Sequence, residues 1–271
     1  MEKESKLDFK SPSLITRLKG MLSVDFYRLF HTPLFYIVLA ISAIIPAMIV
    51  TMTGGTDGGM MYTSVWQVIA SDKTLYVVSD ISEYANMNMV FIFGGIMLSI
   101  FIGHDYKSGY VKQLFTSHPK KQDYMISKSL VGAFSMACMC GTYLIGSVMA
   151  GLIAGISFSV GVWSLICALL GKVIMSLGWA SLYVFLNVIF RKFFGISIAS
   201  SFFFGTGILI IGFAAILGNT PLLNIFLYGS SVSASLSCNF LSVLSCLVVS
   251  VSWAVIYGLL GTLVLNKCDV Y

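Results

Sequence analysis

The chain of 271 residues is 58% hydrophobic and only 10% charged, with a formal net charge of +5. Soluble globular proteins carry about 25% charged residues, so this chain has too little polar surface to cover a soluble body of its size. The composition therefore predicts an integral membrane protein. At roughly 20 residues a span, membrane helices take up most of the length, and we expect no ATPase or other enzyme domain within it.

The N-terminal region is polar at first and then amphipathic. Residues 1–12 are polar, whereas residues 13–30 place apolar side chains at near-helical spacing, with charged residues between them. The apolar positions are Leu14, Leu18, Leu22, Phe26 and Leu29. A basic amphipathic helix directly before a span is typical of the inner membrane surface, and we favour this interfacial interpretation. The alternative is that residues 13–30 are the solvated start of the first membrane helix.

Six apolar stretches are long enough to cross a bilayer as helices. They are predicted at residues 33–52, 86–103, 128–155, 172–190, 194–218 and 241–265. No Asp, Glu, Lys or Arg occurs from Phe193 to Asn266, and because this run is too long for one span it must hold two helices and a turn. The expected fold is an all-α integral membrane protein of six transmembrane helices, with one transmembrane domain over residues 1–271. The fourth stretch has an alternative boundary, with Lys172 inside a longer helix that starts near Val162.

The segment between the last two stretches, residues 219–240, is too apolar for an ordinary exposed loop. It contains Pro221, Gly229 and many serines, a composition that does not favour one long helix. We expect apolar re-entrant helices here, short and dipping into the outer face of the membrane.

Residues Gly151 to Gly155 form a G-x-x-x-G pattern near the end of the third stretch. Two glycines at this spacing let a second helix approach closely. Such patterns also arise by chance in a chain with 25 glycines, so we expect packing within the chain first and a subunit contact second.

Lysine and arginine are distributed unevenly between the predicted loops. Six precede the first span, five lie in residues 104–128, two follow the fourth span directly, and one is Lys267. The other side of the membrane holds only Lys73 and, at its edge, Lys172. Because basic loops stay on the cytoplasmic side, we expect a multi-pass membrane protein with both termini in the cytoplasm.

Motifs for hydrolytic or metal chemistry are missing from the sequence. There is no phosphate-binding G-x-x-x-x-G-K-[ST] loop, no H-E-x-x-H metal motif and no G-x-S-x-G nucleophile motif. Ion-coupled carriers usually hold a charged residue in mid-membrane, and the one candidate, Lys172, is expected to snorkel to the outer surface. We therefore expect no catalytic residue, no metal and no cofactor in this chain. The near absence of charge within the spans disfavours an ion-coupled carrier and suits amphipathic or lipid-like cargo.

The basic loop at residues 104–128 holds the most informative pattern. A short helix is predicted, with Ser108 as its N-terminal cap and Pro119 just beyond its end. One face of this helix is apolar and is formed by Val111, Leu114 and Phe115. Such a helix either lies on the membrane or docks into a groove on a partner, and these residues alone do not decide between the two.

A longer series of residues in the same loop follows a defined order: an acidic residue, an aromatic and a basic residue, Ser-Gly, a hydrophobic-basic-x-Leu-hydrophobic run, small residues, a proline, a basic cluster and a final lysine. The residues in these places are Asp105, Tyr106, Lys107, Ser108, Gly109, Val111, Lys112, Leu114, Phe115, Thr116, Ser117, Pro119, Lys120, Lys121 and Lys128. This order resembles the first intracellular loop of ABC transporter type-2 permeases. Tyr110 departs from the pattern, since a small residue or threonine is more usual there.

The resemblance covers the whole chain in outline. Members of that family have an N-terminal interfacial helix, six spans with both ends in the cytoplasm, and apolar re-entrant helices between spans five and six. The ending Asn266-Lys267-Cys268-Asp269 is similar to the short basic-acidic tail of many members.

The resemblance implies the permease subunit of an ATP-driven ABC exporter in a bacterial plasma membrane. It implies a second permease chain, identical or different, and separate ABC ATP-binding subunits that hold ATP and magnesium; no nucleic-acid partner is expected. The implied cargo is a peptide, a drug or another amphipathic molecule. The residues implied to couple the chain to the ATPase are Asp105, Tyr106, Ser108, Gly109, Val111, Lys112, Leu114 and Phe115.

A different class of function stays open beside this one. The same loop would serve a non-transporting membrane anchor or sensor that recruits a soluble partner through residues 104–128. A P-loop ATPase encoded next to this chain would favour the exporter over the anchor.

Overall fold

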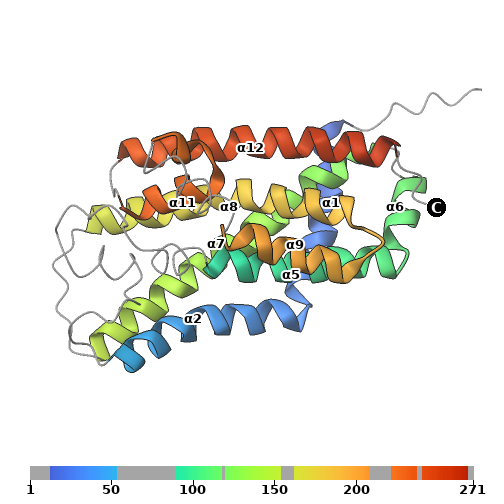
Figure 1. Ribbon diagram of the computed structural model, residues 1–271. Helices are drawn as coiled ribbons and strands as arrows, with labels where there is room; N and C mark the ends of the chain where they lie inside the picture. Colours follow the sequence, from blue (N-terminus) through green and yellow to red (C-terminus); the bar gives the residue numbers. More distant parts are fainter. Residues whose placement is uncertain are drawn as a thin grey trace, which may run out of the picture.

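The computed structural model describes residues 13–53, 89–117, 120–153, 162–207, 221–236 and 240–267. Within these ranges every regular element is a helix and no strand occurs, which confirms the predicted all-α class (Figure 1). The elements are α1 (Leu14–Phe30), α2 (Pro33–Thr53), α5 (Met89–Lys107), α6 (Tyr110–Ser117), α7 (Lys121–Ile153), α8 (Val162–Ile189), α9 (Phe194–Gly205), the 3-10 helix η1 (Pro221–Ile225), α11 (Leu227–Leu236) and α12 (Phe240–Lys267).

Four helices, α5, α7, α8 and α12, are long and apolar enough to cross a membrane. Helices α1 and α2 pass the same test only as a pair, which would give a fifth span. The described part of the chain is therefore compatible with a multi-pass membrane protein and holds four or five candidate spans.

The chain bends sharply between α1 and α2. Helix α1 begins at the Ser13 cap, whose hydroxyl accepts a hydrogen bond from the amide of Thr16. After His31 and Thr32 the chain turns by 66° into α2, which starts at Pro33, a favourable residue for the first turn of a helix. Helix α1 is therefore a separate helix and not a straight extension of α2.

Helix α8 lies at the centre of the bundle and packs along α12 and α7. Of its apolar stretch 61% is buried, against only 11% for α12. An aromatic stack runs from Phe91 on α5 through Trp179 to Tyr183 on α8, with ring centroids 5.5 and 5.7 Å apart. The outward face of α12 instead exposes a row of large apolar side chains, including Leu247, Val251 and Leu259, which suits a helix that faces lipid rather than water.

Two helices begin before the spans predicted within them. The third helix starts at Lys121, seven residues before the predicted span at 128–155. The fourth helix starts at Val162, which confirms the alternative boundary. Lys172 therefore lies inside α8, where its ammonium group donates to the backbone oxygen of Ser231 at 3.4 Å.

The predicted fifth span is not one continuous helix over residues 194–218. Helix α9 ends at Gly205, and Gly207 adopts a φ of +68°. That left-handed conformation ends a helix, and glycine adopts it without strain. A Cβ on Gly207 would also lie 2.0 Å from the ring of Tyr228. Residues 208–218 lie outside the described part of the chain.

Short helices follow in the segment predicted as re-entrant. The 3-10 helix η1 and helix α11 occupy residues 221–225 and 227–236, and α11 packs against both α8 and α12. Its Ser231 hydroxyl accepts a hydrogen bond from the indole of Trp179 at 2.9 Å. The prediction of short helices is confirmed, and a hydrogen bond joins α11 to the central helix α8.

Helix α9 is held by a buried neutral cluster, which we define as Ser99, Asn187, Ser197 and Ser201. The Asn187 amide donates to Ser99 at 3.0 Å, and the Ser197 hydroxyl donates to the Asn187 carbonyl oxygen. Ser99 and Ser201 lie 2.8 Å apart through their hydroxyls. All four residues are at least 98% buried, so uncharged hydrogen bonds join α5, α8 and α9 in an apolar setting.

Candidate functional site

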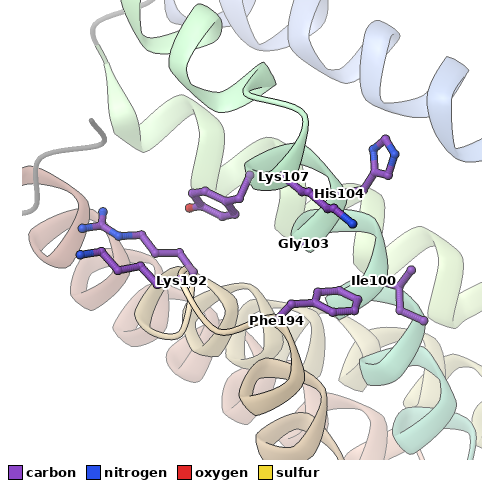
Figure 2. Close-up of a pocket in the computed structure, with 8 residues that line it drawn as sticks. Ile100, Gly103, His104, Lys107, Lys192 and Phe194 are labelled. Carbon is purple, nitrogen blue, oxygen red and sulfur yellow. The ribbon is translucent and has the colours of Figure 1, made fainter.

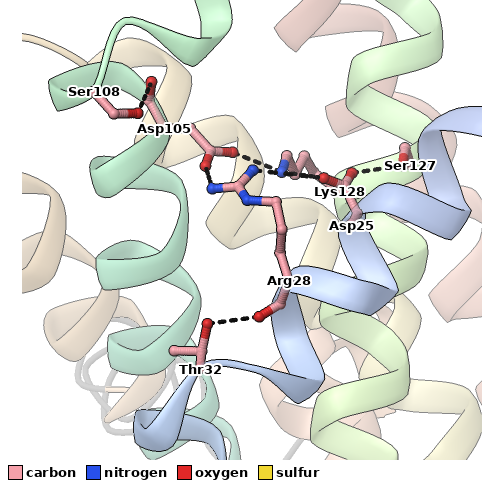
Figure 3. Close-up of polar contacts among 7 residues, drawn as sticks. All are labelled: Asp25, Arg28, Thr32, Asp105, Ser108, Ser127 and Lys128. Atoms are coloured by element: carbon pink, nitrogen blue, oxygen red, sulfur yellow. Dashed lines mark hydrogen bonds and ion pairs between the residues drawn. The ribbon is translucent and has the colours of Figure 1, made fainter.

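Four charged side chains meet where α1, α5 and α7 come together, directly beside the start of α6 (Figure 3). We call Asp25, Arg28, Asp105 and Lys128 the ionic cluster. The Lys128 ammonium lies 2.7 Å from Asp25 and 2.6 Å from Asp105. Arg28 donates to the other oxygen of Asp105 and lies 3.9 Å from Asp25. The hydroxyl of Ser127 also donates a hydrogen bond to the Asp25 carboxylate, at 2.8 Å.

The ionic cluster is deeply buried and electrically balanced. The side chains of Asp25, Asp105 and Lys128 are 2%, 0% and 1% exposed, while that of Arg28 is 25% exposed. Burying one such charge alone is costly, but two carboxylates facing two cations compensate each other. Burial by itself lowers the pKa of Arg28, yet its hydrogen bond to Asp105 and the charges of Asp105 and Asp25 raise the pKa overall. Arg28 is therefore held in its charged form.

Aromatic rings cover the two cations. Arg28 lies over the rings of Tyr110 and Phe101, at 4.5 and 5.3 Å from their centroids. Lys128 lies 4.7 Å from the centroid of Phe101 and 5.6 Å from that of Tyr124. Cation–π contacts of this kind strengthen as water is excluded. Tyr110, the residue that departs from the family pattern, thus links α6 to the ionic cluster.

The predicted loop helix is present as α6, but its cap is not the predicted one. The Ser108 hydroxyl donates back to the Asp105 carbonyl oxygen at 3.4 Å, at the end of α5. Gly109 takes the capping position, since its carbonyl oxygen accepts from the amides of Lys112 and Gln113. Gly109 has a φ of +75°, which glycine adopts without strain. The turn between α5 and α6 therefore depends on Gly109, and Ser108 lies exposed before it.

The apolar face of α6 packs mainly against the rest of the chain. Val111 is 1% exposed, and Leu114 and Phe115 are half-buried against the core. The ring of Phe115 meets that of Tyr124 edge-on at 5.6 Å. The exposed side chains of residues 107–116 are polar ones: Lys107, Ser108, Lys112, Gln113 and Thr116. Any partner of α6 would therefore contact chiefly this polar face. Of the apolar face it would reach only the exposed edges of Leu114 and Phe115.

The eight residues predicted for coupling thus divide into five that point inward, two that face outward and one that forms a turn. The inward group anchors α6 and consists of Asp105, Tyr106, Val111, Leu114 and Phe115. Ser108 and Lys112 face outward, and Gly109 forms the turn between α5 and α6.

Two further contacts tie the same end of the bundle together. Arg17 of α1 donates to the Asp123 carboxylate of α7 at 2.8 Å. Lys121 of α7 donates to the backbone oxygen of Leu265, near the end of α12. These contacts join α1 to α7 and α7 to α12 at the end of the bundle where α6 lies (Figure 1).

An aromatic pocket of about 190 Å³ lies among α8, α9, α11 and α12. Its walls include Trp179, Phe203, Phe226, Trp253 and Tyr257. The indole N–H of Trp253 donates to the backbone oxygen of Ile225 at 2.8 Å, and its ring stacks on that of Tyr257 with the centroids 5.2 Å apart. A pocket with aromatic walls offers apolar surface with few polar groups, which fits an apolar or amphipathic molecule.

Sequence reasoning missed the ionic cluster as a unit. It placed Asp105 at the loop and Lys128 at the start of a span, and it left Asp25 and Arg28 among the charged residues of an interfacial amphipathic helix. The available signal was their position, since each lies within a few residues of an apolar stretch, where an unpaired charge is unfavourable.

The described residues contain no group of three or more His, Cys, Asp and Glu side chains that could hold a metal ion. Comparison of the chain with models of known protein families gives no match, and comparison with curated proteins gives none either. The resemblance to ABC type-2 permeases therefore rests on the order of residues in the 104–128 loop and on the outline of the helices.

Proposed function

We propose that this chain is the permease subunit of an ATP-driven exporter of the ABC type-2 kind. In this proposal the chain crosses a bacterial plasma membrane six times, has both termini in the cytoplasm and pairs with a second permease chain. A separate ATP-binding subunit holds ATP and magnesium and carries out hydrolysis. The chain itself supplies the membrane route and the contact through which nucleotide binding moves it.

The observation that carries the proposal is the placement of α6. This short helix lies at one end of the bundle with a polar face exposed, and its inner face packs beside Asp25, Arg28, Asp105 and Lys128. A helix on a mobile loop would move without consequence for the spans. One that touches a buried ionic cluster joining α1, α5 and α7 passes its displacement to all three.

Coupling then follows from differential contacts in two states. An ATPase dimer that closes on nucleotide would favour the arrangement of α6 that fits its closed form. Because the ionic cluster has fixed geometry and low tolerance for partial separation, α1, α5 and α7 would shift together at this end rather than one by one. The polar residues Ser108 and Lys112 would contact the ATPase, and Gly109 would act as the pivot.

The proposed cargo is a peptide, a drug or another amphipathic molecule. Two observations support this class: the candidate spans hold few charges away from the end that carries the ionic cluster, and the pocket among α8, α9, α11 and α12 has aromatic walls.

Co-purification in detergent from the native host tests the proposal. We expect an ATP-binding subunit in about equal amount, and we expect its loss on Lys112→Glu, which reverses an exposed charge on α6 without entering the core. Lys19→Glu is the matched control, because Lys19 is an exposed lysine on a different helix, α1. The control should keep the ATPase bound.

A different result would favour the anchor or sensor function. Recovery of a partner that lacks ATPase activity, bound through the same face of α6, would contradict the exporter. Leu114→Asp with Phe115→Asp is a poorer test, since both side chains contribute to the packing of α6 and their loss would also disturb the fold.

A further inference from the structure

A cleft of about 500 Å³ opens between the end of α5 and the turn that joins α8 to α9 (Figure 2). Its lining includes four basic side chains, His104, Lys107, Arg191 and Lys192. Figure 2 shows Lys192 extending from the α8–α9 turn, Lys107 and His104 on α5, and the ring of Phe194 beside Gly103. Arg191 belongs to the same turn as Lys192 and also lines the cleft. No carboxylate occurs among the described residues that line the cleft.

The positive charge of this cleft is not neutralised by the neighbouring acidic residue. Asp105 follows His104 in the chain, but its side chain is fully buried and its oxygens face Arg28 and Lys128. The Nη1 nitrogen of Arg191 is buried and has no hydrogen-bond partner among the described residues. A buried donor without an acceptor is unfavourable, so an anion at this position would satisfy a group that the chain leaves open.

The walls of the cleft are held in place by packing. A Cβ on Gly103 would lie 2.3 Å from the ring of Phe194, so only glycine lets this ring lie directly against α5. Phe194 is also the first residue of α9, and no side chain caps that helix. The uncapped amides of its first turn and the helix dipole favour negative charge beside Phe194.

We propose that this cleft binds the phosphate group of an anionic phospholipid. Basic pockets at the ends of membrane helices recognise charged lipid headgroups, and arginine forms paired hydrogen bonds to phosphate oxygens. A lipid is favoured over a soluble phosphate because the cleft is bordered by exposed apolar side chains: Phe193, Phe194 and Ile196 are 62%, 47% and 47% exposed. These side chains would contact the acyl chains while the basic residues contact the headgroup.

The test is a lipid titration of delipidated protein in detergent, followed by native mass spectrometry. The probes are dioleoyl phosphatidylglycerol, dioleoyl phosphatidylcholine and inorganic phosphate. We expect saturable binding of phosphatidylglycerol that phosphatidylcholine does not match. Arg191→Gln with Lys192→Gln should weaken it about tenfold or more, whereas Lys19→Gln with Lys267→Gln, which removes the same charge outside the cleft, should leave it within about twofold.

Lys107→Gln on the opposite wall is a second variant that does not depend on the α8–α9 turn, and it should weaken binding several-fold. Arg191→Lys should recover part of the affinity. Unchanged phosphatidylglycerol binding in both cleft variants would overturn the proposal, as would equal losses in the cleft and control pairs. Displacement of the lipid by millimolar inorganic phosphate would overturn the assignment to a lipid and leave a site for a soluble anion. None of these outcomes depends on an ATPase partner.

Discussion

Two buried polar clusters hold three helices each, and they do so by different chemistry. The ionic cluster joins α1, α5 and α7 through full charges beside α6. The neutral cluster joins α5, α8 and α9 through hydroxyl and amide groups. Helix α5 belongs to both, with Asp105 in one and Ser99 in the other.

The difference lies in what each cluster tolerates. Uncharged hydrogen bonds inside a membrane protein are modest in strength, so the loss of one partner in the neutral cluster is expected to cost little. Buried ions that lose their partners are far more costly, so α1, α5 and α7 are constrained to move as one unit near α6. A helix that transmits movement to the spans is best placed beside a cluster of buried ions.

Lys128→Met should have the largest effect. The side chain keeps its length, but Asp25 and Asp105 are left with Arg28 as their only cation in the ionic cluster. Breaking a buried ion pair by removing one partner costs about 3–5 kcal/mol. The measurement is the free energy of unfolding in mixed detergent micelles, with Lys19→Met as the control because Lys19 is exposed.

A second substitution sharpens that result. Asp25→Asn added to Lys128→Met restores a one-to-one balance between Asp105 and Arg28. The double variant should therefore be more stable than the sum of the two single changes predicts, with a coupling of about 1–3 kcal/mol. Strict additivity would mean that the charges of the ionic cluster do not act as a unit.

Gly146→Leu should rank second and affects neither cluster. A Cβ at Gly146 would lie 2.2 Å from the backbone oxygen of Ala43, so the larger side chain must push α2 away from α7. Overpacking of this kind costs about 1–3 kcal/mol. Gly141→Leu lies on the same helix with nothing within 4 Å of its Cβ, and it should leave the unfolding midpoint nearly unchanged. Equal effects at both positions would argue against close packing of α2 on α7.

Sequence patterns predicted the elements better than their contacts. Runs without charge located the apolar helices, and the near-helical spacing of leucines predicted α1. The G-x-x-x-G pattern at residues 151–155 lies partly outside the described residues, whereas a close approach occurs at Gly146, which no pattern singled out. A glycine shows its role only when the opposing backbone is known.

The candidate site was predictable in part. The short helix at residues 110–117 followed from its apolar spacing and from Pro119. Its inward packing did not, since an amphipathic helix has the same pattern whether it faces a partner or its own core. The pairing of Asp25 with Lys128 joins residues about one hundred positions apart, and one sequence holds no information on such a contact beyond the cost of leaving either charge alone.

Asn187→Ala tests the neutral cluster and should have a smaller effect than Lys128→Met. Ser99 and Ser197 would lose their shared partner, at a cost of about 1–2 kcal/mol. The expected readout is a lower unfolding midpoint together with easier proteolysis next to α9. Asn266→Ala is the control, since Asn266 is exposed at the end of α12. A loss of stability as large as that of Lys128→Met would mean that the neutral and the ionic cluster do not differ in what they tolerate.

Gly109→Ala should have the smallest effect and acts at the turn between the ionic cluster and α6. Nothing lies within 4 Å of the added Cβ, so the cost comes only from a φ of +75°, which an L side chain adopts at about 1 kcal/mol. Gly20→Ala in α1 also has open space around it, but there the backbone is helical, and alanine should stabilise by about 0.5–1 kcal/mol. Replacing glycine by alanine is thus expected to destabilise the protein at Gly109 and to stabilise it at Gly20. Stabilisation by alanine at both positions would mean that the turn into α6 changes its backbone conformation at no cost. In that case α6 would not be rigidly joined to the ionic cluster.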